Sequence, residues 1–237
     1  MSRALPDAAR PEGDPAIDVV RNPRARRTRL AVDHVTGRVR LTLPPRISTA
    51  AGLRWAAGQR GWIDAQLARL PQPRPFAPGA RVPVDDAELL IVWQADAARR
   101  VVRDGDRLVT GGPVDTLDRR ITAWLRAEAL RLLSADTADY AGLAGVTVSR
   151  VTIGDPRGRW GSCATSGIIR YSWRLVLAPR WVRRATAAHE VAHRRHMHHG
   201  PDFHALVAEL YGADPTPARH WLRRHGAALH WFGRGAG

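Results

Sequence analysis

Residues 189–204 read HEVAHRRHMHHGPDFH and contain six of the ten histidines in the chain. Within this stretch His193 follows His189 by four positions, and Glu190 comes directly after the first of the two. On a helix, residues four apart lie about 40° apart around the axis, so both imidazoles share one face and can bind one zinc ion at about 2 Å. Glu190 is rotated by about 100° from His189, so it can approach a metal-bound water without being a ligand. This is the His-Glu-x-x-His pattern of zinc hydrolases, and the alternative is a surface helix with solvated histidines.

A third metal ligand is expected, because a catalytic zinc usually has three protein ligands and one open position. His196 lies on the same helical stripe, but about 10 Å along the axis from the first ligand, which is too far for one coordination sphere. His199 is the better candidate if the helix ends before it, and Gly200-Pro201 favours such an end. The resulting spacing equals that of metzincin proteases. Glu209 is the reserve ligand, in the manner of thermolysin-like enzymes, although an ordinary surface glutamate is the simpler interpretation.

The overall composition is that of a globular protein with one core and a small accessory lobe. The chain has 237 residues, of which 44% are apolar and 25% are charged. It contains no apolar run of about 20 residues, and its first residues lack the apolar core of a secretory signal, so we expect a cytoplasmic protein without a membrane span. Cys163 is the single cysteine, which excludes an internal disulfide and an all-cysteine zinc site.

The formal net charge is +15, and all 37 basic residues are arginines. Such a bias reflects coding preference as much as selection for a partner. A basic surface could attract nucleic acid or a nucleotide, but the charge alone does not indicate such a partner. The absence of lysine is more informative about the catalytic mechanism than the net charge is. It excludes Schiff-base catalysis, a lysine general base and the lysine of a P-loop.

The pattern of apolar residues predicts an α+β fold in three parts. These are a disordered N-terminal arm (1–23), a β-rich N-terminal lobe with one helix (24–112), and a C-terminal domain of helices around a small sheet (113–237). Strands are expected at Arg29–Asp33, Arg38–Leu43, Glu88–Gln94, Arg99–Arg103, Arg107–Thr110 and Val146–Ile153, with a second β-rich run at Ile168–Leu177. Helices are expected from Ser48 to about Leu70, from Val114 to Tyr140, from Arg180 to about His198, and at Pro201–Tyr211 and Pro217–Leu229.

Four segments together resemble a known family. They are residues 159–163 (RWGSC), 173–179 (WRLVLAP), 189–193 (HEVAH) and 196–203 (HMHHGPDF). They resemble the YgjP-like metallopeptidase family, which is related to the SprT-like zinc proteases, and the resemblance covers about residues 24–232. It implies that 113–237 is a zincin-like catalytic domain of the minigluzincin or SprT type, with the order helix, sheet, active-site helix.

The resemblance also implies roles for individual residues. His189, His193 and His199 would be the zinc ligands, and Glu190 the general base. Two positions depart from the family pattern, since Ser172 stands where asparagine is common and His204 where tryptophan is frequent. We expect these departures to affect substrate contacts and not the metal.

Residues near the histidine cluster are candidates for substrate binding. An edge strand beside the cluster could pair with an extended peptide, which brings in Trp160, Tyr171 and Trp173, although core packing of the two tryptophans is an equal alternative. Arg174 and His196 are candidates for steadying an oxyanion or the substrate, but a paired arginine and an exposed histidine are the simpler interpretations.

Cys163 could be a fourth ligand or a reactive thiol, and a small buried residue is the simpler interpretation.

The sequence therefore predicts a zinc-dependent metallopeptidase that hydrolyses peptide bonds in a peptide or protein substrate, with a metal-activated water and Glu190 as general base. One alternative is a zinc-dependent hydrolase of nucleotide phosphoanhydrides. The other is a non-enzymatic, DNA-associated module in which zinc is structural. The physiological substrate and the oligomeric state cannot be read from the sequence.

Overall fold

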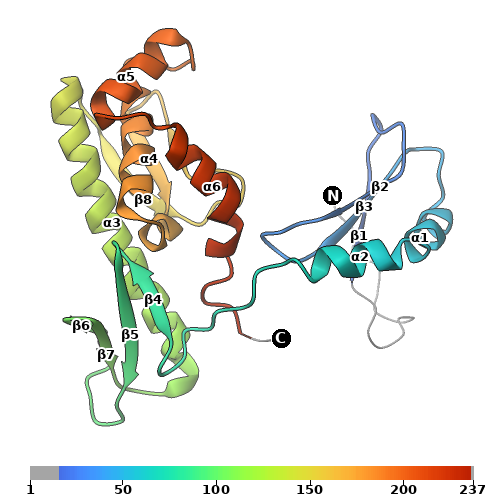
Figure 1. The fold of residues 1–237 in the computed structure, drawn as a ribbon, viewed down its shortest axis with the longest axis horizontal. Helices are drawn as coiled ribbons and strands as arrows, with labels where there is room; N and C mark the ends of the chain where they lie inside the picture. Colours follow the sequence, from blue (N-terminus) through green and yellow to red (C-terminus); the bar gives the residue numbers. More distant parts are fainter. Residues whose placement is uncertain (1–15, 236–237) are drawn as a thin grey trace. The chain divides into compact units, whose positions relative to one another are not determined.

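The computed structural model describes residues 16–235, which form two compact units with mixed α and β structure (Figure 1). The first unit ends at Gln72 and the second begins at Pro73. The boundary therefore differs from the expected one at residue 112, because the β-rich segment 73–112 packs with the C-terminal elements. None of the helices in residues 16–235 is both long and apolar enough to cross a membrane.

The first unit contains a three-stranded sheet in the order β1-β3-β2. Its strands are β1 (Ile17–Arg21), β2 (Arg29–Val32) and β3 (Val39–Leu43). The expected hairpin is confirmed, since β2 and β3 pair antiparallel. The structure corrects the expected disordered arm in part, because residues 17–21 form a strand parallel to β3. The rest of that arm, up to residue 15, lies outside the described residues.

Two short helices follow the sheet, where one long helix was expected. They are α1 (Thr49–Ala57) and α2 (Arg60–Leu67). Ser48 caps α1 as predicted, since its hydroxyl oxygen accepts a hydrogen bond from the Ala51 N–H at 3.1 Å. The helix ends at Gly58, whose backbone N–H bonds the carbonyl of Arg54, because glycine lowers the helical propensity of this turn.

The second unit begins with a four-stranded sheet in the order β4-β5-β7-β6. The strands are β4 (Arg81–Val84), β5 (Ala87–Trp93), β6 (Val102–Asp104) and β7 (Arg107–Thr110). Strand β4 was not among the expected strands. Pro83 is tolerated because β4 is an edge strand, where a missing N–H donor need not break the sheet.

The remaining elements of the second unit include one long helix and a second small sheet. They are a 3-10 turn (Val114–Thr116), α3 (Leu117–Ala144), β8 (Arg150–Gly154), β9 (Gly161–Cys163), β10 (Ile168–Ser172), a second 3-10 turn (Trp173–Leu177), α4 (Arg180–Ala192), α5 (Pro201–Tyr211) and α6 (Thr216–Leu229). The sheet order is β8-β10-β9, so β9 is an edge strand. Helix α4 packs against both α3 and α6 and lies between them in Figure 1.

Buried ion pairs fix the position of α4. Arg183 on this helix is 2% exposed, and its guanidinium donates to Asp136 of α3 at 2.7 Å and to Asp85 of the β4–β5 turn at 2.6 Å. Asp86 in the same turn accepts a hydrogen bond from the backbone N–H of Arg180 at the start of α4. Both turn aspartates have positive φ, 51° and 67°, as a two-residue hairpin requires. The turn therefore joins the four-stranded sheet to the helix that carries His189.

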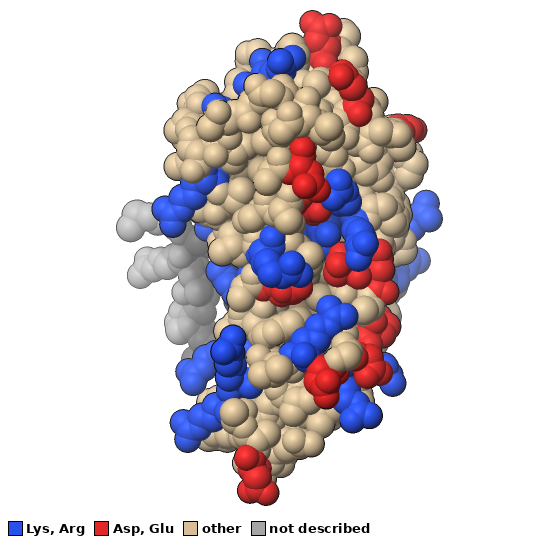
Figure 2. All heavy atoms as spheres, turned by 90° about the vertical axis from the view of Figure 1, so that its left-hand side faces the viewer, with Lys and Arg blue, Asp and Glu red and all other residues tan. Residues whose placement is uncertain are grey.

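Charges of both signs are mixed on the molecular face in Figure 2, where arginine side chains lie among Asp and Glu side chains. Ion pairs of the second unit include Arg131 with Glu128 at 2.6 Å and Arg184 with Asp139 at 3.1 Å. Part of the net positive charge is thus neutralised locally, and this face is not a continuous basic surface.

Candidate metal centre

Helix α4 ends earlier than the sequence suggested, and this early end shapes the centre. Its last helical residue is Ala192, with His193 as C-cap, whereas the expected helix ran to about His198. The next turn is held by Arg194, whose guanidinium donates to the carbonyls of Thr147, Ala164 and Thr165 at 3.1–3.3 Å. These bonds draw the chain away from the helix axis. The condition for His199 to serve as a ligand, a helix that stops before it, is therefore met.

Three imidazoles converge at this point. The Nε2 atoms of His189 and His199 are 3.2 Å apart, and the ligand atoms of these two residues and His193 all lie within 4.8 Å of one another. Two nitrogens bound to a tetrahedral zinc at about 2.0–2.1 Å are about 3.3 Å apart, so the closest pair already has the separation that zinc requires. The residues present thus fit a zinc ion.

His193 is oriented by a hydrogen bond to the backbone. Its Nδ1 lies 3.1 Å from the carbonyl oxygen of His196. A carbonyl only accepts, so Nδ1 carries the proton and Nε2 keeps its lone pair for a metal. His196 contributes to the centre through this carbonyl, and its imidazole is not part of the metal-binding group.

The environment favours the neutral form of two of the three histidines, His189 and His193. Burial, followed by the neighbouring His193 and His199, lowers the pKa of His189 to about 4. Burial also lowers the pKa of His193. The buried ring of Phe203 packs against all three imidazoles, with centroid distances of 4.5–4.9 Å. Neutral imidazole is the form that binds a metal, so the pocket favours binding at neutral pH.

Glu190 lies next to the histidines and is 5% exposed. Burial raises the pKa of its carboxyl to about 7, while the charge of Arg159 acts in the opposite direction. Strand β9 passes directly beside this side chain. A Cβ atom at Gly161 would lie 2.6 Å from Cγ of Glu190, so only glycine leaves the glutamate its place. Sequence reasoning included Gly161 in a motif but could not detect this contact, because β9 itself was not predicted.

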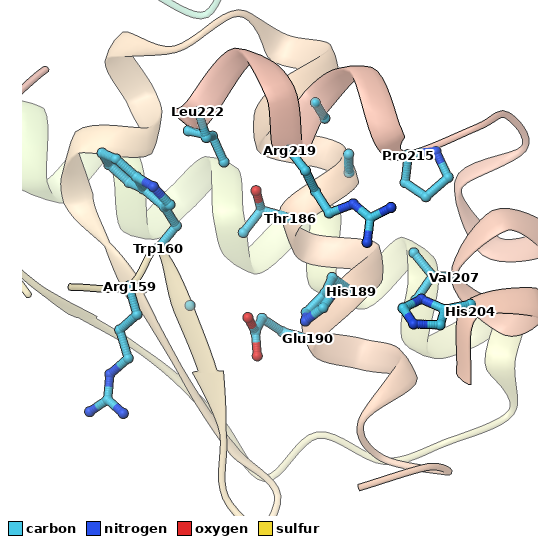
Figure 3. Close-up of a pocket in the computed structure, with 13 residues that line it drawn as sticks. Arg159, Trp160, Thr186, His189, Glu190, His204, Val207, Pro215, Arg219 and Leu222 are labelled. Carbon is cyan, nitrogen blue, oxygen red and sulfur yellow. The ribbon is translucent and has the colours of Figure 1, made fainter. Parts of the chain in front are cut away.

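A cavity of about 250 Å³ opens beside His189 and Glu190. Figure 3 shows these two side chains next to each other on α4, with Trp160 and Leu222 beside each other at the far end of the cavity. Trp160 therefore lines the cavity, and its role in substrate binding stays a prediction. The remaining lining comes mainly from α4, α5 and α6.

Tyr171 is placed away from the cavity. Its ring is fully buried, and its hydroxyl is 2.9 Å from that of Thr137 on α3. Burial raises the pKa of this phenol far above its usual range. The structure therefore corrects the expectation of a substrate contact, and the reason is that alternate residues of β10 face the core.

Trp173 and Arg174 are also structural. Trp173 is buried, and the guanidinium carbon of Arg174 lies 4.5 Å from the centre of its ring. The same guanidinium pairs with Asp155 at 2.7 Å and donates to the carbonyls of Leu229 and Phe232. Burial raises the pKa of the Asp155 carboxyl, but the hydrogen bond and the charge of Arg174, together with Trp173 and His230, lower the pKa overall. Arg174 therefore fastens the end of α6 and has no donor aimed at the metal centre.

The two reserve ligands are not part of the cluster. Glu209 is exposed on α5, and neither it nor Cys163 belongs to the group of side chains that could hold a metal. Cys163 is half-buried, and burial raises the pKa of its thiol. A protonated, half-buried thiol agrees with the simpler interpretation of this residue as a small packed side chain.

The comparison with protein families gives one match. A family model described as YgjP-like, metallopeptidase domain matches residues 26–225 of the 237. No curated protein and no solved structure matches the chain significantly. The matched range includes every residue of the centre described above.

Proposed function

The chain belongs to the YgjP-like metallopeptidase family, and from this premise we propose that it is a zinc peptidase of the His-Glu-x-x-His type with a zincin-like catalytic domain. The observation that supports the proposal best is the convergence of three imidazoles beside a buried carboxylate. The substrate would be a peptide or an unfolded protein segment. Membership of this family implies a metal-dependent hydrolase. The mechanism of peptide-bond hydrolysis is our proposal.

His189, His193 and His199 would hold the zinc ion through three neutral nitrogens, which is the donor set of many catalytic zinc sites. When bound, zinc would supply Lewis-acid activation of water and of the scissile carbonyl. The carbonyl of His196 fixes the ring of His193, so the protein holds one ligand in place before the metal arrives.

Glu190 would move the proton. Its carboxylate would take a proton from the attacking water and deliver it to the leaving amine. A general acid–base group works best when its pKa is close to the operating pH, and burial brings that of Glu190 to about 7. The buried surroundings of Glu190 thus give its carboxyl a pKa that suits proton transfer.

Strand β9 would align the substrate. It is the edge strand of its sheet and it passes next to Glu190, so an extended peptide that pairs with β9 would bring a carbonyl towards the histidines. The space on the side-chain face of Gly161, at the start of this strand, is filled by the side chain of Glu190, so the strand and the carboxylate are in direct contact.

The decisive experiment uses the purified full chain loaded with one equivalent of zinc. We expect cleavage of unfolded casein, its loss after chelation, and recovery on adding zinc back. The Glu190→Gln variant should retain zinc but cleave about 10²- to 10⁴-fold more slowly, which is the usual contribution of a general base.

The two alternatives make different predictions in the same assays. Phosphate release from nucleoside triphosphates without casein cleavage would contradict the peptidase and favour phosphoanhydride hydrolysis. If the Glu190→Gln variant retains zinc and every measurable function, zinc has a structural role and the enzyme proposal is wrong.

A further inference from the structure

The cavity beside Glu190 has walls of small and apolar side chains. Ala185 of α4, Val207 of α5 and Ala218 of α6 are buried, and each of them lines the cavity. Helix α6 packs against α4, and the two alanines keep the space between these helices open. A larger side chain at either alanine would occupy this space. The depth of the cavity therefore depends on two specific small residues.

The polar side chains that line the cavity are those of Thr186, of the two centre residues His189 and Glu190, and of three exposed residues, Arg159, His204 and Arg219. The hydroxyl of Thr186 donates to the carbonyl of Val182 at 2.9 Å, so its proton is not available to a ligand. His189 and Glu190 stand at one side, where the proposed chemistry takes place. A polar side chain inserted past them would lose its water without gaining a partner, which is unfavourable.

Trp160 forms a fixed part of the wall. A Cβ at Gly226 of α6 would lie 2.5 Å from the six-membered ring of this tryptophan, so glycine allows the indole to rest directly on the helix. His230 packs against the same indole, with ring centroids 5.6 Å apart. The indole is thus held from behind while it lines the cavity. This arrangement gives the cavity a defined shape before any ligand binds.

Exposed cations stand among the lining residues. Arg159 and Arg219 both line the cavity and are solvent-exposed. A further positive charge brought near these two arginines would be repelled, whereas an apolar side chain has no such cost.

We propose that this cavity is a specificity pocket for one large apolar side chain, such as leucine, methionine or phenylalanine, of the residue next to the scissile bond. The same pocket excludes lysine and arginine. This inference rests on the proposed peptidase function, because the position next to the scissile bond follows from the contact of the cavity with Glu190. The cavity volume of about 250 Å³ is large enough for one such side chain but not for a folded segment.

The first test reads the preference from cleavage sites. A mixture of peptides is digested by the zinc-loaded full chain, and the cut positions are identified by mass spectrometry. We expect large apolar residues at one fixed side of the cut, favoured over glycine by about 100-fold in kcat/KM, as for the filling of a hydrophobic pocket. An even distribution of residues on both sides of the cut would overturn the pocket while leaving the peptidase intact.

Variants of the wall should change the preference in opposite directions. Ala218→Leu fills the cavity and should shift the preference to glycine and alanine, whereas Leu222→Ala enlarges it and should favour tryptophan. Ala205→Leu is the matched control, because Ala205 is exposed on α5 and does not line the cavity. The inference is wrong if the profile of either wall variant equals that of the control.

A binding measurement separates the pocket from catalysis. The Glu190→Gln chain is titrated with fluorescein-labelled Gly-Ser-Gly-X-Gly-Ser-Gly peptides in which X is leucine, phenylalanine, glycine or lysine. The leucine and phenylalanine peptides should bind at least about tenfold more tightly than the glycine peptide, and the lysine peptide most weakly. Equal affinities would contradict the pocket even if the wild-type chain cleaves casein. Selective binding without any casein cleavage would support the pocket and contradict the peptidase.

Discussion

The backbone of Gly161 faces the side chain of Glu190, with room between them for a hydrogen atom but not for a methyl group. A Cβ at this glycine would lie 2.6 Å from Cγ of the glutamate and 2.7 Å from Cδ. The edge strand and the helix of the metal centre therefore meet at the one carboxylate that the proposed chemistry needs. Because the carboxylate is also buried, any shift of the strand changes both its position and its pKa.

The first prediction concerns Gly161→Ala. The added methyl group should displace the Glu190 carboxylate and lower kcat/KM for peptide cleavage by about 10²-fold or more, because the proposed general base is moved from its place. Zinc content should stay at one equivalent, since the imidazoles are not touched. Activity and bound zinc are measured on the same preparation. Gly158→Ala is the control, because nothing lies within 4 Å of a Cβ at that position; equal losses in both variants would contradict the steric explanation.

The second prediction concerns zinc and stability. A ligand that binds only the folded state stabilises it, by about 2.7 kcal/mol when its free concentration is about 100 times Kd. The unfolding temperature should therefore rise with added zinc and fall with a chelator. His199→Ala should abolish this response with little effect on the metal-free protein, because this histidine is exposed.

His220→Ala serves as the control, because His220 is an exposed histidine on α6 outside the metal-binding group. Its response to zinc should equal that of the wild type. A zinc response retained in the His199→Ala variant would contradict the assignment of the third ligand.

The metal centre could be predicted largely from local spacing. The positions of His189, Glu190 and His193 follow from helical geometry, and the need for a break before His199 was visible in Gly200-Pro201. The turn that follows the break is held by hydrogen bonds from Arg194 to three carbonyls that are distant in the sequence, and these bonds depend on tertiary structure. The sequence alone could not show where the helix would stop.

Strands β9 and β1 were not predicted from the sequence, and the physical reason is the same for both. Strand β9 is three residues long and contains Gly161, Ser162 and Cys163, which lack the β-branched and aromatic side chains of a typical strand. Strand β1 pairs in parallel with β3, although β2 lies between these two strands in the sequence. Both strands exist because a partner offers hydrogen bonds, and short-range patterns do not contain that information. The position of Tyr171 was predicted wrongly for the same reason, since the inward direction of its side chain is set by the register of β10.

The third prediction concerns pH and His230. Burial, followed by the charge of Arg174, lowers the pKa of this histidine to about 4, although Asp155 acts in the opposite direction from 3.9 Å. At neutral pH the imidazole is therefore uncharged, and the short distance to the aspartate is not an ion pair. In the unfolded chain a histidine takes up a proton near pH 6.5, so between pH 6.5 and about 4 the unfolded state binds more protons.

Stability should consequently fall as the pH drops through this window, and His230 should account for at most about 3 kcal/mol of the loss. His230→Gln should reduce the loss, which is measured as the free energy of unfolding in urea at pH 7, 6, 5 and 4 with zinc removed. His220→Gln, on the same helix but exposed, is the control and should leave the pH dependence unchanged. An identical slope in wild type and His230→Gln would show that the burial of this imidazole does not matter.

The last prediction concerns the ion pairs that hold α4. Arg183→Met removes one of the two arginines that pair with Asp136. Asp136 is 4% exposed, and the arginine that remains, Arg184, has a side chain that is 34% exposed. Breaking a buried pair by removing one member costs about 3–5 kcal/mol, because the other charge stays buried. Arg180→Met is the matched control: its side chain is 55% exposed while it pairs with Asp85, so the cost should be below about 1 kcal/mol. Urea unfolding of both variants at pH 7 distinguishes the two cases. Equal destabilisation would mean that the exposed turn contact, and not the buried pair, anchors the helix of the metal centre.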